Sequence, residues 1–148
     1  IQTAVLNPLA SESFNAQDLR AVIICPSNPY VSIAPILSLA GARNQLRNIA
    51  APIIAVSPIV DGQAIKGPAA KMMRELGCNP SALSVAQEYR DIVDGFVIDN
   101  KDAAEARQIE EMGQRVLVTD TIMTSITVKK RLANNIMDFA NEIQARNI

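Results

Sequence analysis

The sequence has 148 residues, of which 49% are apolar and 20% are charged, with a formal net charge of −1. These values are ordinary for one globular domain. The nearly neutral charge argues against a nucleic-acid binder, which normally carries a basic face. No apolar run approaches the roughly 20 residues that a membrane-spanning helix needs, so we expect partners other than nucleic acid or membrane.

The first 20 residues show no clear hydrophobic period, and we expect residues 1–20 to be the tail of an upstream region, followed by an α/β part over residues 21–148. Four short runs rich in Val and Ile then stand out, and they lack the polar alternation of a half-exposed strand. We expect each run to be a strand that is covered on both faces. The runs are Ala21–Cys25, Ile53–Ser57, Gly95–Ile98 and Arg115–Thr119.

Residues with helical spacing follow each of these runs. The predicted helices cover Val31–Leu39, Ala42–Arg47, Ala69–Leu76, Ser81–Arg90, Lys101–Met112 and Ser125–Arg146. In the third of these, the apolar side should consist of Ala69, Met72, Met73 and Leu76. The last helix should bury Leu132, Ile136, Phe139 or Ala140, and Ile143, because these side chains recur on one face. Strands that alternate with helices predict an α/β fold with a doubly wound, mostly parallel sheet.

Histidine is absent from the sequence, which excludes Ser-His-Asp and Cys-His mechanisms within this chain. The two cysteines, Cys25 and Cys78, are too few for a disulfide framework. Because Cys25 lies in an apolar run, we interpret it as a reduced core cysteine. The chain begins without the basic and apolar segments of a signal peptide, so a cytoplasmic location is the default expectation.

Ligands of open α/β sheets bind beyond the carboxyl ends of the strands, and this rule selects four loops. The first loop begins Pro26-Ser27-Asn28-Pro29, in which two prolines stiffen the chain. Ser27 and Asn28 offer side-chain donors for a phosphate or a base edge. The alternative is a capped turn, because Ser and Asn often bond to neighbouring backbone.

The second loop, residues 57–68, begins with Ser57 and Pro58 and is longer than the usual connection of about 2–6 residues. It ends in Lys66-Gly67-Pro68, directly before a predicted helix. The free N–H groups of the first helical turn, with Lys66 nearby, could hold an anion. Gly67 would allow close approach of the backbone. An ordinary helix start is the alternative.

The third and fourth loops carry Asp99 and Asp120. We interpret Asp99 as a helix N-cap rather than a catalyst, and Asp120 presents the same choice ahead of the last helix. If their strands are neighbours, the two carboxylates could bind Mg²⁺ together with water and phosphate. The run Lys129-Lys130-Arg131 is interpreted as solvated helix surface.

Four blocks of the sequence resemble, in the same order, the signature of the 2-phospho-L-lactate transferase (CofD) family. They are Ile24–Pro29 with Ser32–Leu37, Ala55–Val60 with Ile65–Ala69, Asp94–Asp99, and Val118–Met123. The resemblance corresponds to the C-terminal half of the family's length. The Gly-rich phosphate loop and the acidic residues of the family's other half have no match in this chain, so we assign no catalytic residue. Asp61 stands where glycine is common in the family.

The resemblance implies a Rossmann-like core, Mg²⁺ held mainly by groups of the other half, and a homodimer. The implied reaction moves a 2-phospholactyl, phosphoenolpyruvyl or phosphoglyceryl group from a diphosphoguanosine donor to a deazaflavin alcohol, with release of GMP, in coenzyme F(420) biosynthesis. The blocks at Ser27-Asn28 and Ser57-Pro58 would help line the guanine nucleotide pocket. With the anion site of the second loop, the expected cofactor-binding residues are Ser27, Asn28, Pro29, Ser57, Pro58, Lys66 and Gly67.

Two other hypotheses stay open. A non-enzymatic relative of the gluconeogenesis-factor type would bind nucleotide sugars and would prefer UDP-sugars over guanine nucleotides. The segment Thr119–Met123 agrees with the transferase pattern instead. A structural or assembly role would show as concentration-dependent size without nucleotide binding, because uncovered sheet edges and apolar faces associate.

Overall fold

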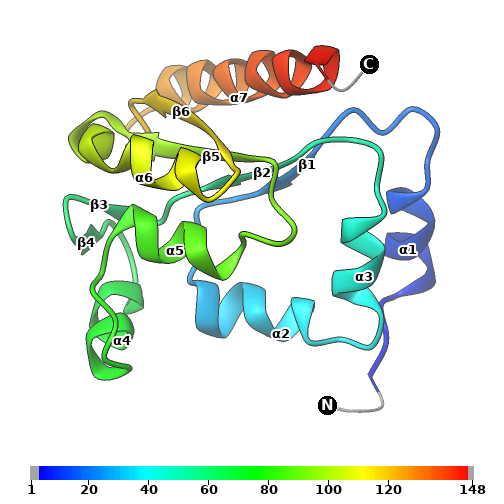
Figure 1. Cartoon of the computed structure of the whole chain (residues 1–148), viewed down its shortest axis with the longest axis horizontal. Helices are drawn as coiled ribbons and strands as arrows, with labels where there is room; N and C mark the ends of the chain where they lie inside the picture. The colour runs from blue at the N-terminus through cyan, green and yellow to red at the C-terminus, as the bar shows by residue number, and fades with distance from the viewer. Residues whose placement is uncertain (1–3, 147–148) are drawn as a thin grey trace.

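The computed structural model describes residues 4–146. Four strands form one parallel sheet in the order β1-β2-β5-β6 (Figure 1). This confirms the expected α/β fold with a parallel sheet. The strands are β1 (Val22–Ile24), β2 (Ile53–Val56), β5 (Gly95–Asp99) and β6 (Arg115–Thr119).

The helices also follow the predicted order. Two of the predicted helices do not begin as regular α-helix. The first begins with the wider π-helical turn η1, and the other begins with the tighter 3₁₀ helix η2. None of the described helices is long and apolar enough to cross a membrane. The helices that follow β1 are η1 (Pro29–Ile33), α2 (Ala34–Leu37), α3 (Ala42–Arg47), α4 (Ala69–Glu75), α5 (Ala82–Glu88), η2 (Asn100–Glu105), α6 (Ala106–Glu111) and α7 (Ile126–Arg146).

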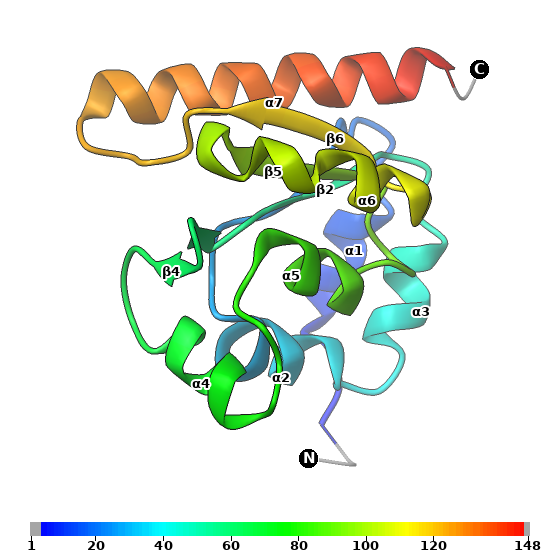
Figure 2. The same cartoon turned by 60° about the vertical axis from the view of Figure 1, so that its left-hand side comes forward.

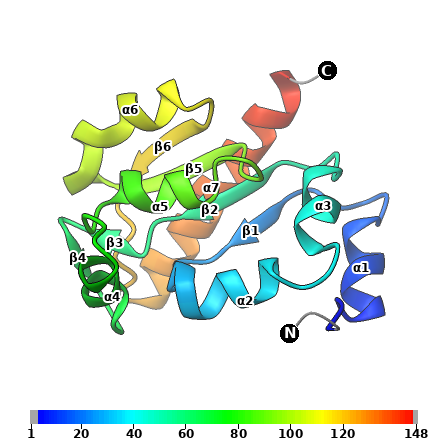
Figure 3. The same ribbon diagram turned by 60° about the horizontal axis from the view of Figure 1, so that its bottom comes forward.

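Helix α7 covers one face of the sheet, and the helices that connect the strands lie on the other face (Figures 1 and 3). Because side chains alternate along a strand, Ile54 and Val97 face α7, whereas Ala55 and Phe96 face the connecting helices. The predicted apolar stripe of α7 is confirmed, since all of its members are buried: Leu132, Ile136, Phe139, Ala140 and Ile143.

Two predictions about single side chains are wrong. Cys25 is exposed rather than buried, because β1 ends at Ile24 and lies at the edge of the sheet. Leu76, expected on the buried side of its helix, is 60% exposed. It is the C-cap of α4, so the apolar face ends before it.

A short antiparallel hairpin within the second loop was not predicted. Strands β3 (Ile59–Val60) and β4 (Gln63–Ala64) pair across a two-residue turn. Asp61 and Gly62 both have positive φ, 52° and 69°, as a type I′ turn requires. Asp tolerates this left-handed conformation better than most residues, which fits a position where the resembling family commonly has glycine.

Helix α1 (Pro8–Phe14) was also not predicted. The Asn7 side chain caps it by accepting a hydrogen bond from Leu9 N at 2.9 Å, and Pro8 occupies the first helical position. None of its residues is buried, and Gln45 of α3 holds it through bonds to Ser11. Residues 1–3 of the expected tail lie outside the described residues, and the division at residue 20 stays a prediction.

Candidate functional site

The loops at the carboxyl ends of the strands enclose a cavity of about 230 Å³. The β3–β4 hairpin region and the loop between β6 and α7 lie at the same end of the molecule (Figure 2). Residues that follow β1, β2 and β6 line the cavity together with one residue of α7. The polar side chains on its wall are Asn28, Ser57, Lys66, Thr121 and Lys129, and the other lining residues are apolar.

Asn28 lies on the wall, and its side chain also caps the π-helical turn. Its Oδ1 accepts hydrogen bonds from Tyr30 N at 2.9 Å and Val31 N at 3.3 Å, and its Nδ2 donates to Met72 Sδ at 3.3 Å. The capped turn is therefore present, with the residue still at the cavity wall. Its part in ligand binding stays a prediction.

The neighbours of Asn28 do not line this cavity. Pro29 is buried at the start of η1 and lines a separate cavity of about 270 Å³ beside Tyr30 and Tyr89. Ser27 is half-buried between the strand end and the turn. The structure thus brings only one of these three predicted residues to the cavity wall.

Ser57 and Pro58 shape the turn that leaves β2. The Ser57 side chain is buried, its Oγ donates to Ile59 O at 2.8 Å, and it accepts from Ile59 N at 3.1 Å. These bonds fix the start of the hairpin, so Ser57 holds the wall of the cavity in place. Pro58 is part of the same wall.

Lys66 is exposed and contributes a cation to the cavity wall, while Gly67 and Pro68 follow just outside it. Gly67 has φ 75°, and a Cβ atom added there would meet open space. Glycine is therefore favoured by the left-handed backbone rather than by crowding. Pro68 forms the N-cap of α4, directly before the helix as expected.

Hydrogen bonds to Asp99, the last residue of β5, hold the loop at residues 120–124 against the end of this strand. Asp99 Oδ2 accepts from Thr121 N at 2.9 Å and from Thr121 Oγ1 at 3.1 Å, while its Oδ1 accepts from Lys101 N at 3.1 Å. Burial acts to raise the pKa of this carboxyl, but the hydrogen bonds from Thr121 and Lys101 hold the pKa below its ordinary value. The N-cap prediction is confirmed, and the bond to Thr121 is an addition that the sequence did not indicate.

Asp99 and Asp120 do lie at neighbouring strand ends, because Asp99 is paired with Thr119 in the sheet register. Asp120 is engaged, however, since its Oδ1 accepts from Ile122 N at 3.3 Å and its Oδ2 from Arg131 at 2.5 Å. The described residues contain no group of three or more acidic or cysteine side chains placed to hold a metal ion. Because hydrogen bonds within the chain already engage both oxygens of each carboxylate, the pair does not fit the Mg²⁺ site considered for it.

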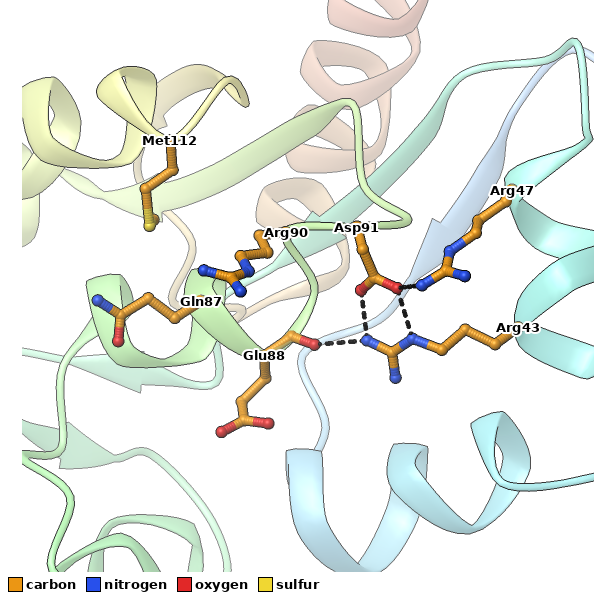
Figure 4. Close-up of a pocket in the computed structure, with 7 residues that line it drawn as sticks. All are labelled: Arg43, Arg47, Gln87, Glu88, Arg90, Asp91 and Met112. Atoms are coloured by element: carbon orange, nitrogen blue, oxygen red, sulfur yellow. Dashed lines mark hydrogen bonds and ion pairs between the residues drawn. The ribbon is translucent and has the colours of Figure 1, made fainter.

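A larger cavity, about 580 Å³, lies at the opposite edge of the sheet, where the strands begin. Its central feature is Asp91, which is held between Arg43 and Arg47 (Figure 4). Arg43 Nε donates to Asp91 Oδ2 at 2.8 Å, and the bonds from Arg43 keep the pKa of Asp91 well below its ordinary value. The two ion pairs of Asp91 join α3 to the segment before β5, so we interpret this cavity as structural.

Thr121, Met123 and Lys129 line the cavity at the carboxyl ends but were not predicted as site residues. The loop rule pointed to the segment that contains the first two, without singling out a residue. One feature of the sequence could have indicated Lys129 as a site residue: a lysine in the first turn of a helix interacts unfavourably with the helix dipole.

Comparison with known proteins gives a family match over most of the chain. The family described as 2-phospho-L-lactate transferase CofD matches residues 3–137. Three similar relatives, each named 2-phospho-L-lactate transferase, come from Methanocaldococcus jannaschii, Methanosarcina barkeri and Methanococcoides burtonii, with identities of 43%, 37% and 38%. The alignments cover 90%, 97% and 95% of this chain but 41%, 45% and 45% of the relatives, so the chain spans less than half of their length.

Proposed function

The chain belongs to the 2-phospho-L-lactate transferase (CofD) family, and on that premise we propose that it forms the donor-binding part of such an enzyme. The donor would be a lactyl-, enolpyruvyl- or glyceryl-diphosphoguanosine, and the acceptor a deazaflavin alcohol. One observation carries the proposal: the loops after β1, β2 and β6 converge on one cavity that contains Lys66 and Lys129.

The chemistry of the cavity wall suits a nucleoside diphosphate. Among the described residues that line it, none is acidic, so the two lysines leave the cavity with positive charge. That charge favours the diphosphate, while the apolar walls near Ile65 and Met123 suit the uncharged part of the donor. The cavity, about 230 Å³, is smaller than the roughly 300–1,000 Å³ of common ligand sites. We infer that the rest of the family's length completes the pocket.

The proposed reaction is phosphoryl transfer without a covalent enzyme intermediate. The acceptor hydroxyl attacks the phosphorus that carries the three-carbon group, a new P–O bond forms, and the P–O bond to GMP breaks. GMP leaves with the bridging oxygen, and the hydroxyl proton is lost to a base outside this chain. Within this chain, Lys66 and Lys129 would neutralise the negative charge on the diphosphate and on the departing GMP. The Mg²⁺ implied by the family would need ligands from outside this chain, and no step of the proposed reaction runs through it.

The test is a calorimetric titration of the chain with GDP and with UDP-glucose, in parallel with an Asn28→Asp variant. Asp can keep the caps to Tyr30 and Val31 but adds a negative charge at the cavity wall, so folding should survive while GDP binding weakens by about tenfold. Thermal unfolding of the variant provides the control for folding.

The outcomes separate the hypotheses. Saturable GDP binding that Asn28→Asp weakens, without a UDP-glucose signal, supports the transferase. A preference for UDP-glucose favours the nucleotide-sugar-binding regulator instead. GDP binding that is unchanged in Asn28→Asp contradicts the placement of the donor in this cavity.

A further inference from the structure

Lys129 places a positive charge at the amino end of a helix, where a cation is unfavourable. It lies in the first turn of α7, and this turn contains no acidic residue. Cations are disfavoured at the amino end of a helix, where the dipole is positive. Among the described residues Lys129 forms no ion pair, in contrast to Arg131 two positions later, which pairs with Asp120. Helix stability therefore gives no reason for a lysine at this position.

Lys66 brings a second cation to the same cavity from a separate element. It lies in the loop that leads into α4, and the ion pairs among residues 4–146 do not include it. Two positive side chains, and a wall on which no described residue is acidic, act in the same direction. An anion is the ligand that would balance them.

We propose that Lys129 and Lys66 together bind the diphosphate oxygens of the nucleotide, with Lys129 as the anchor supplied by α7. This inference rests on the proposed function for the identity of the nucleotide, but the cation pair itself requires only a diphosphate. Loop 120–124, held to β5 by the bonds from Thr121 to Asp99, sets where α7 begins and so where Lys129 stands.

The experiment uses pyrophosphate as the probe of the cation pair, and GDP, UDP and guanosine as probes of the nucleotide. Binding is measured by calorimetry for the chain and for Lys129→Ala, Lys66→Ala and Lys130→Ala. Lys130 is the matched control, because it is exposed on the next position of α7 and does not line the cavity. Thermal unfolding is measured for each variant.

Lys129→Ala and Lys66→Ala should each weaken pyrophosphate and GDP binding by about tenfold, as the loss of one charge-assisted hydrogen bond predicts. Lys130→Ala should stay within about twofold of the parent. The melting temperature of Lys129→Ala should be unchanged or higher, because the variant removes a cation from the amino end of α7. A merely structural role for Lys129 would lower it.

Pyrophosphate binding that depends on both lysines supports the cation pair. If the affinity for GDP then does not exceed the affinity for UDP, the guanine donor of the proposed function is contradicted while the cation pair stands. GDP binding that is unchanged in Lys129→Ala overturns the anchor and leaves the proposed function standing. Absence of binding for every probe overturns both.

Discussion

The pKa values of two buried carboxylates near the candidate site are shifted in opposite directions. Hydrogen bonds hold the pKa of Asp99 below its ordinary value, so its contribution to stability is present above the ordinary carboxyl range and is lost as the pH falls through the lowered pKa. Asp102 is also buried, but only its Oδ1 has a partner, Asp61 N at 3.0 Å, and its Oδ2 has none among the described residues. Burial raises the pKa of Asp102.

Replacing Asp102 by Asn should raise the melting temperature at neutral pH. The folded protein binds the Asp102 proton more tightly than the unfolded chain, so the charged carboxylate opposes folding above its raised pKa. Asn keeps an oxygen for Asp61 N and removes the charge. The gain should shrink as the pH falls toward the ordinary carboxyl value of about 3.9. Asp138→Asn, on the exposed surface of α7, should show no gain. A gain for Asp102→Asn that is independent of pH would rule out the burial of a charged carboxylate as its cause.

The residues of the candidate site could be predicted from the sequence only in part, because long-range contacts between single residues help to place some of them. Asn28, Ser57, Pro58 and Lys66 lie in the loops that follow β1 and β2, so the strand-end rule brings them to the cavity. Thr121 also lies in a loop that this rule selects, but its bond to Asp99 of the neighbouring strand helps to set where it and Lys129 stand. That contact joins residues far apart in the chain, and composition or spacing does not reveal it. The roles in binding of all seven predicted residues stay predictions.

At the scale of elements, the strands could be predicted because each is a continuous apolar run, and α7 because its apolar pattern is long and regular. The β3–β4 hairpin and α1 were missed, although each carries a local signal: Asp61-Gly62 is a common type I′ turn, and Asn7-Pro8 is a common helix start. Both elements are short and bury few residues or none, so no hydrophobic period indicates them.

The contact between α7 and the sheet depends on Gly95, the first residue of β5. A Cβ atom added there would lie 2.7 Å from Ile143 Cδ1 and 2.7 Å from Phe139 Cε1. Gly95→Ala should therefore push α7 away and cost about 1–3 kcal/mol of unfolding free energy, measured by denaturant unfolding. In an Ile143→Val background, which lacks the Cδ1 atom, the same substitution should cost less. Equal costs in the two backgrounds would show that the contact does not limit the packing.

At the scale of the whole molecule, two cavities compete for a ligand. The larger lies where the strands begin, and its wall combines three arginines with the carboxylates of Glu88 and Asp91. The smaller lies where the strands end, and its lysines have no acidic partner on the cavity wall. Size alone would favour the first cavity as the ligand site. The positive charge of a wall without acidic described residues, and the strand-end rule, favour the second cavity. The chain spans less than half of its relatives' length, and we infer that the smaller cavity is one wall of a larger site.

The measurement that tests this account most directly is a titration of the ¹⁵N-labelled chain with GDP, followed by the shifts of its backbone amide signals. We predict that the shifts concentrate in residues 26–32, 57–68 and 120–129, which surround the cavity at the carboxyl ends of the strands. Shifts that concentrate instead around Arg43, Arg47 and Arg90, in the cavity at the other edge of the sheet, would contradict the account.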